Sequence, residues 1–166
     1  MSDLSRLADE PFTYTEVGAT RGPLPAGYHH VREVARIGTG RPRFEDAAAR
    51  VMRFGMLRGA GARVTSSTEV AEVGSVVVVG LGLVRVPCRV VYVVDDENRR
   101  GFAYGTLAGH AERGEELFAV RYDPSEDAVY AEVTAFSRHA TWWSRVAGPV
   151  TSLVQRVVTK RYLSAV

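Results

Sequence analysis

The chain has 166 residues, of which 46% are hydrophobic and 24% charged, with a formal net charge of +2 and a single cysteine. This apolar content excludes a disordered protein, and one cysteine excludes a disulfide framework or a zinc site built from several cysteines. The length is that of one domain, which buries about 70% of its unfolded surface and needs neither disulfides nor a structural metal for its core.

No stretch of the sequence resembles a targeting or membrane-spanning segment. Residues 1–11 mix acids with Arg6 and lack the apolar stretch of a secretory signal. The longest apolar run, residues 76–84, contains two glycines and is far shorter than the roughly 20 residues of a membrane-spanning helix. We therefore expect a cytoplasmic protein with no membrane span, in which Cys88 is a reduced, buried thiol.

The N-terminal part of the chain predicts an irregular segment, a strand and a helix. Residues 1–27 contain six glycines and prolines, which is typical of a segment that wraps around a domain, and we expect residues 28–166 to form that single domain. A strand is predicted over residues 28–37. Apolar residues then recur at three- and four-residue spacing from Phe44 to Met56, which predicts one helix that starts near Pro42 and ends at Gly59 and Gly61.

The middle of the chain alternates β-type runs with short polar turns. We predict strands at about residues 63–67, 75–82, 87–94, 101–107, 115–122 and 128–136. Parallel crossovers need a dozen or more residues, so these short connections predict an antiparallel meander. A helical region follows from Ala140 to Ala165, broken at Gly148 and Pro149, and its longer helix is predicted from Pro149 to about Leu163.

This order of elements predicts an α+β fold in which a curved antiparallel sheet of about seven strands grips a long C-terminal helix. The order is similar to that of START-like or helix-grip domains, which commonly hold an apolar ligand between sheet and helix. Such a resemblance concerns topology and carries little information about function. An α+β sandwich with a filled core is the alternative architecture.

The densest group of chemically active side chains lies in residues 101–118, GFAYGTLAGHAERGEELF. Together with residues 87–91, 135–138 and 148–150, this segment resembles the bacterial and plant family called domain of unknown function 1990. The resemblance runs from about residue 12 to the C-terminus, and Gly-Phe-x-Tyr-Gly-Thr-Leu-x-Gly-His and Gly-Glu-Glu-x-Phe are its most specific pieces. The family has no established activity, so the resemblance implies no substrate. His139 departs from the family pattern, in which proline follows Ser-Arg.

The same segment is predicted to form a hairpin with His110 and Glu112 at its tip. The alternation of a strand places Glu115 and Glu116 on opposite faces, so one of these acids shares its face with apolar residues. If that face is concave, burial raises the pKa of the acid unless a cation pairs with it. Alternatively, the two acids lie at a solvated strand end or bind backbone N–H groups of the glycine-rich turn.

We expect the domain to bind a small, largely apolar or amphipathic molecule between the sheet and the C-terminal helix. The residues predicted to contact this ligand are Tyr104, Thr106, His110, Glu112, Glu116, Ser137 and Trp142. Ser137 is also predicted to lie near the N-cap of the C-terminal helices.

Two other functions remain open from the sequence. One is an enzyme in which His110 and a nearby glutamate transfer protons. The other is an interaction module that uses residues 138–166, which carry five cations and no acid. We expect no metal and no cofactor, because the ligand spacings are absent. We also expect no nucleic-acid partner, because aromatic residues are not interleaved with the cations. Neither the ligand nor the oligomeric state is indicated by the sequence.

Overall fold

The computed structural model describes residues 3–140, 160, 163, 164 and 166. This part of the chain forms one seven-stranded antiparallel sheet in the order β1-β7-β6-β5-β4-β3-β2. The strands are β1 (His29–Thr39), β2 (Arg63–Ser66), β3 (Val76–Leu81), β4 (Val84–Asp96), β5 (Arg99–Thr106), β6 (Glu112–Asp123) and β7 (Ala128–His139). The described helices are α1 (Asp3–Ala8), the 3-10 helix η1 (Ala19–Arg21), α2 (Arg41–Met52) and α3 (Gly55–Gly59). None of the described helices is long and apolar enough to span a membrane.

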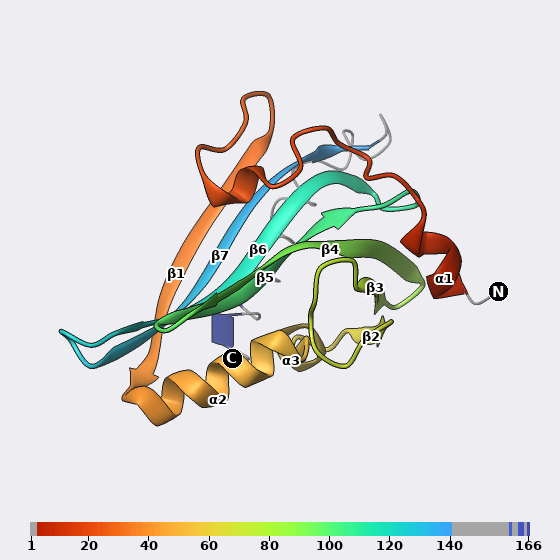
Figure 1. Ribbon diagram of the computed structural model, residues 1–166. Coiled ribbons are helices and arrows are strands. Elements are labelled where there is room, and N and C mark those ends of the chain that lie inside the picture. The colour runs from red at the N-terminus through yellow and green to blue at the C-terminus, as the bar shows by residue number, and fades with distance from the viewer. Residues whose placement is uncertain (1–2, 141–159, 161–162, 165) are drawn as a thin grey trace.

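The sheet is strongly curved, and its strands follow the predicted meander from β2 to β7 (Figure 1). β1 then pairs with β7, so α2 and α3 carry the chain from one edge of the sheet to the other. Four strands, β4 to β7, are longer than the sequence indicates, because their ends remain paired beyond the apolar runs. The prediction of a curved antiparallel sheet is confirmed.

The predicted helix from Pro42 to Gly59 is in fact two helices, and this prediction is wrong at Phe54. Phe54 has a left-handed backbone with φ of 60°, which ends the first helix and turns the chain. Its ring is fully buried and packs edge-on against Phe102 with 5.2 Å between centroids, which offsets the cost of the backbone conformation. The next position, Gly55, favours glycine, because a Cβ atom there would lie 2.8 Å from the backbone oxygen of Arg50.

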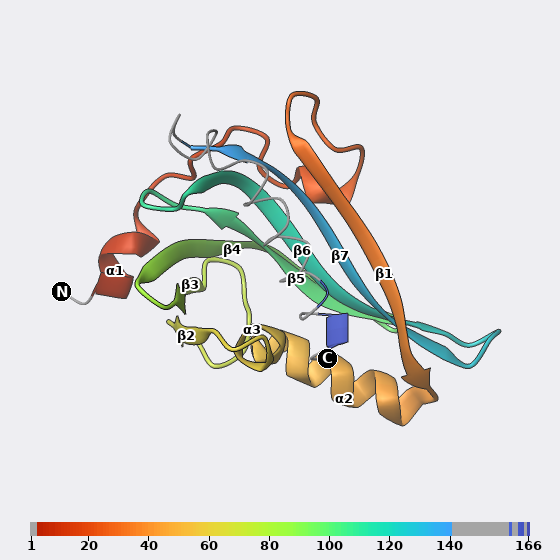
Figure 2. The same cartoon turned by 180° about the vertical axis from the view of Figure 1, so that it is seen from behind.

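The main core lies between the concave face of the sheet and helices α2 and α3 (Figure 2). Its largest fully or almost fully buried rings are Phe44, Phe54, Phe102 and Phe118. Leu163 packs against the same core. Of the helix predicted from Pro149 to Leu163, the structure describes Lys160 and Leu163, and the rest lies outside the described residues.

The N-terminal segment crosses the opposite, convex face of the sheet (Figures 1 and 2). α1 covers one end of that face, where Leu7 packs against Val76, Val78 and Leu107. Residues 9–28, which we call the N-terminal strap, then run over the strands that follow. The sequence predicts only irregular structure for residues 1–27, whereas the structure has two short helices there, α1 and η1.

Candidate functional site

β6 carries two adjacent glutamates on opposite faces of the sheet. Glu116 lies opposite Tyr104 of β5 and Ala135 of β7, on the concave face. Glu115 lies opposite Gly105 and Phe136, on the convex face beneath the strap. The structure thus determines which acid shares its face with the main core, a point that the strand alternation alone leaves open.

Glu115 is buried, with 2% of its surface exposed, and it binds the strap. One carboxylate oxygen accepts hydrogen bonds from the Tyr14 hydroxyl and the Gly18 N–H, both at 2.7 Å. The other oxygen accepts from the N–H of Thr20 at 3.1 Å and from its hydroxyl at 2.5 Å. Four donors from the strap thus provide hydrogen bonds to both carboxylate oxygens. Because these bonds hold the strap on the sheet, Glu115 has a structural role.

The strap approaches the sheet closely above Glu115. Gly105 has no side chain, and a Cβ atom there would lie 2.2 Å from the Tyr14 hydroxyl oxygen. The Thr106 hydroxyl lies 2.6 Å from the Thr13 hydroxyl and accepts a hydrogen bond from the Gly114 N–H at 3.0 Å. Thr106 therefore connects the strap to the hairpin, and its hydroxyl is already engaged.

Glu116 has much poorer hydrogen bonding on the concave face. Within the described chain its carboxyl group accepts one long hydrogen bond, from the Tyr104 hydroxyl at 3.5 Å. Burial raises the pKa of Glu116 to about 8, and the neighbouring Glu112 charge acts in the same direction. Because this pKa lies above 7, Glu116 is mostly protonated, and therefore neutral, near pH 7.

His110 lies at the tip of the β5–β6 hairpin and fixes its shape. Its Nδ1 accepts a hydrogen bond from the Glu112 N–H at 2.9 Å, so this nitrogen carries a lone pair and Nε2 carries the proton. Burial lowers the pKa of His110 to about 4. The imidazole is therefore neutral near pH 7, and the contact with Glu112 is made by its backbone rather than its carboxylate.

The structure places most of the predicted ligand contacts around one small cavity at this rim of the sheet. Its lining residues in the described chain are Tyr104, Thr106, His110, Glu112, Gly114, Glu115, Glu116, Ala135, Phe136 and Ser137. Its volume of about 40 Å³ is enough for a water molecule but not for a whole organic ligand. Trp142 lies outside the described residues.

Three further findings concern residues near this cavity. Ser137 lies inside β7, opposite Gly114, and the ladder continues to His139, while the start of the helical region predicted to follow it lies outside the described residues. His139 lies opposite Glu112, and its buried Nδ1 has no hydrogen-bond partner in the described chain. Among the described residues, no group of three or more His, Cys, Asp or Glu side chains is arranged to hold a metal ion.

The residues that hold Glu115 were not identified from the sequence. Tyr14 and Thr20 are 101 and 95 residues away from it along the chain, and no local spacing signals such a contact. Cys88, expected only to be buried, is fully buried on the concave face, where burial and, to a lesser extent, the charge of Glu116 raise the pKa of its thiol. The thiol is therefore unreactive near pH 7.

Comparison with known proteins agrees with this architecture. The family model described as domain of unknown function (DUF1990) matches residues 13–165. The chain belongs to this family. A UPF0548 protein of Deinococcus radiodurans is 46% identical over 74 residues, which make up 45% of this chain and 37% of that relative. The match therefore spans well under half of the relative's length.

Two solved structures share the fold of this DUF1990 domain. A hypothetical protein from Helicobacter pylori has a TM-score of 0.70 and 9% identity, with 92% of this chain and 96% of the other covered. Norcoclaurine synthase from Thalictrum flavum, in complex with dopamine and hydroxybenzaldehyde, has a TM-score of 0.53 and 10% identity, with 82% and 84% covered. Together with the curved seven-stranded sheet in the described residues, these likenesses confirm the START-like, helix-grip fold.

Proposed function

We propose that this DUF1990 domain binds a small, largely apolar molecule on the concave face of its sheet, with the polar end of the molecule at Glu116. The contrast between the two adjacent acids carries this proposal. Glu115 is fully hydrogen-bonded, whereas the described partner of Glu116 is a hydroxyl at 3.5 Å. A partly buried acid with so few partners among the described residues costs stability, and such groups are concentrated at functional sites.

The hydrogen-bonding groups at the rim define the polar end of the ligand. A neutral Glu116 donates one O–H, and a neutral His110 whose Nδ1 is occupied donates through Nε2. These groups suit an uncharged acceptor such as a carbonyl, ether or hydroxyl oxygen, and they disfavour a carboxylate beside Glu116. The cavity of about 40 Å³ takes only this polar end. The apolar part of the ligand would lie along the concave side chains of β4, β5 and β7 next to Glu116.

The fold supports this assignment. The norcoclaurine synthase structure, which shares the fold at 10% identity, holds two small aromatic molecules. A helix-grip sheet therefore accommodates ligands of the proposed size. The chemistry of the ligand in this chain is inferred from Glu116 and its neighbours, because likeness of fold does not fix function.

Native mass spectrometry of gently purified protein tests the proposal first. We expect a bound species that is released on denaturation. Titration with the neutral dye Nile red provides a second test, and Ala135→Leu should weaken dye binding about tenfold or more, because the larger side chain fills the space beside Glu116. Thr134→Leu is the matched control, since Thr134 is the preceding residue of β7 and lines the opposite face. No co-purified molecule, together with equal dye binding by both variants, would contradict the proposal.

A second function, proton transfer by an enzyme, is favoured by one specific observation. The pKa of Glu116 is raised to about 8 and that of His110 is lowered to about 4, so near pH 7 the acid holds its proton and the imidazole is neutral, with its Nδ1 lone pair engaged by the Glu112 N–H. The two groups make no hydrogen bond to each other in the described residues. If the co-purified molecule incorporates deuterium from heavy water in the presence of the protein, and Glu116→Gln abolishes this exchange, the domain is an enzyme. An unlabelled molecule identifies a binding protein.

A further inference from the structure

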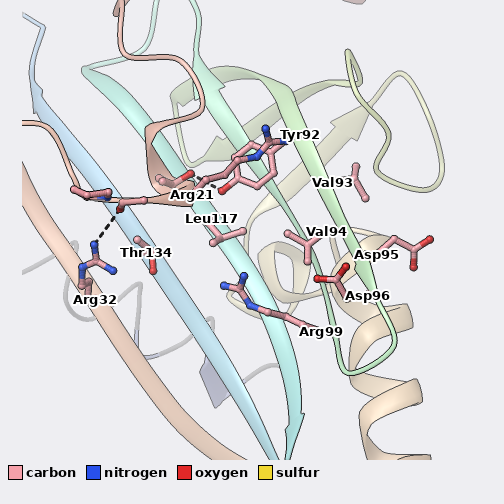
Figure 3. A pocket seen from close by; sticks show the side chains of 13 residues that line it. Arg21, Arg32, Tyr92, Val93, Val94, Asp95, Asp96, Arg99, Leu117 and Thr134 are labelled. Atoms are coloured by element: carbon pink, nitrogen blue, oxygen red, sulfur yellow. Dashed lines mark hydrogen bonds between the residues drawn. The ribbon is translucent and has the colours of Figure 1, made fainter.

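A second, larger groove lies on the convex face of the sheet, away from Glu116. It has a volume of about 620 Å³ and is bordered by η1 and by strands β1, β4, β5, β6 and β7 (Figure 3). None of its lining residues was proposed as a ligand contact from the sequence. The groove lies on the other face of the sheet and shares no lining residue with the concave cavity, so it is independent of the function proposed there.

Arginines from three distant segments of the described chain line this groove. Arg21 lies at the end of η1, with its guanidinium carbon 4.0 Å from the centroid of the Tyr92 ring. Its backbone N–H donates to the Gly18 carbonyl, but its guanidinium makes no hydrogen bond or ion pair with a described residue. Arg32 of β1 has one long hydrogen bond, to the Gly22 carbonyl at 3.4 Å. Arg99 of β5 donates through Nε to Glu132 at 3.0 Å. At least two guanidinium groups thus retain most of their donors.

The floor of the groove is apolar. Leu117, which is 2% exposed, lies at its centre, with Tyr92 and Val94 beside it (Figure 3). Arg32 and Asp96 lie on opposite sides of Leu117, whereas Arg99 lies beside Asp96, its partner in the β4–β5 ladder (Figure 3). An anionic group is therefore attracted to Arg21 and Arg32, on the side of the floor away from Asp96.

The wall formed by η1 is held rigidly in place. The Thr20 side chain lies 2.7 Å from the Tyr92 hydroxyl and also donates to the buried Glu115 carboxylate. Because Thr20 is fixed from two sides, its neighbour Arg21 is positioned over Tyr92 before any ligand arrives. A preorganised site of this kind loses less conformational entropy on binding.

We propose that this groove binds a small organic anion, with its phosphate or carboxylate group at Arg21 and Arg32 and its flat apolar part against Val94, beside Leu117. Guanidinium groups match the geometry of phosphate and carboxylate oxygens and form strong, charge-assisted hydrogen bonds with them. Val94, the partly exposed residue of the apolar floor, adds a preference for an anion with a ring over a bare inorganic ion.

Phenyl phosphate, benzoate and inorganic phosphate are the probes that test this site, titrated in a buffer without phosphate and followed by isothermal calorimetry. At least one of the two aromatic anions should bind at millimolar or lower concentration and more tightly than inorganic phosphate. Arg21→Gln and Arg32→Gln should each weaken that binding about tenfold, the loss expected for one charge-assisted hydrogen bond. Amide NMR shifts should map to η1, to β4 near Tyr92 and to β6 near Leu117.

Arg36→Gln is the matched control. Arg36 lies on the same strand and face as Arg32, opposite Tyr130, and does not line the groove. The proposal is overturned if Arg36→Gln weakens binding as much as Arg21→Gln, because the attraction would then depend on overall charge. It is also overturned if neither aromatic anion binds, if inorganic phosphate binds equally well, or if the amide shifts map to the concave face.

Discussion

At the scale of single residues, Glu115 and Glu116 have the same chemistry and opposite surroundings. The carboxylate of Glu115 accepts hydrogen bonds on both oxygens from the strap. The carboxyl group of Glu116 lies beside a hydroxyl at 3.5 Å and next to an apolar core. The same substitution at the two positions therefore separates a structural role from a functional one.

Glu115→Gln should destabilise the protein by about 3 kcal/mol near pH 7. The amide group of glutamine would point its own donors at the N–H of Gly18 or Thr20, both of which need an acceptor. Urea denaturation measures this loss. A change below about 0.5 kcal/mol would show that these buried contacts contribute little.

Glu116→Gln should have an effect that depends on pH. The pKa of Glu116 is raised from 4.5 when unfolded to about 8 when folded, so the folded state binds the proton more tightly. The stability contributed by this proton is fully present below about pH 4.5 and is lost as the pH rises through about 8. Glutamine remains neutral, so the variant should gain on the order of 4 kcal/mol over the wild type between about pH 4.5 and 9. A difference in stability that does not change with pH would contradict the raised pKa.

The sequence predicts that these two acids face opposite ways, but not which of them meets the core. Alternation along β6 follows from strand geometry alone. The direction of sheet curvature depends on what covers each face. The contacts of Glu115 with Tyr14 and Thr20 of the strap join residues about a hundred positions apart in the chain. Local patterns contain no information about such distant partners, so the structural role of Glu115 emerges only from the fold.

At the scale of elements, the β5–β6 hairpin depends on the imidazole at its tip. His110→Asn should retain the acceptor for the Glu112 N–H, because asparagine forms the equivalent turn with the residue two positions on. The pKa of His110 is lowered from 6.5 to about 4, so its contribution to stability is present above about pH 6.5 and is lost as the pH falls toward 4.

The variant His110→Asn should therefore match the wild type near pH 7 and exceed its stability by about 2 kcal/mol near pH 4. Urea denaturation at both pH values checks this. A large loss already near pH 7 would mean that the imidazole makes contacts that asparagine cannot replace.

The N-terminal strap is a second element that can be tested alone. Gly105→Ala places a methyl group 2.2 Å from the Tyr14 hydroxyl oxygen, so the strap has to move away from β5. We expect a loss of about 2 kcal/mol and faster amide hydrogen exchange in residues 13–20, with little change in α2. Adding Tyr14→Ala should remove most of the effect of the methyl group. Equal effects of Gly105→Ala with and without Tyr14 would place the clash elsewhere.

Element prediction from the sequence succeeds where turn chemistry is local and fails where packing decides. The polar turns between strands define the meander correctly. The three- and four-residue spacing continues from Phe44 to Met56 across the break between α2 and α3, so periodicity alone indicates a single helix. The break at Phe54 is stabilised by a ring contact with Phe102 on β5, which is a tertiary effect.

At the scale of the whole molecule, one strand serves both faces of the sheet. β6 presents Glu116 to the concave cavity and Glu115 and Leu117 to the strap and the convex groove. At the concave site the proposed polar contacts, Glu116 and His110, are neutral near pH 7, whereas the convex groove is bordered by arginines. The two proposed ligands therefore differ in charge, and each can be tested with a probe that does not suit the other face.

The central claim is that the concave face keeps a neutral acid available to a ligand. The most direct measurement is an NMR titration of the Glu116 side-chain carboxyl carbon, assigned by comparison with Glu116→Gln. The account predicts a midpoint near 8, which moves higher when an uncharged ligand accepts the proton of Glu116 in a hydrogen bond. A midpoint near the ordinary value of 4.5, unchanged by any ligand, would show that Glu116 is solvated and that the proposed polar anchor does not exist.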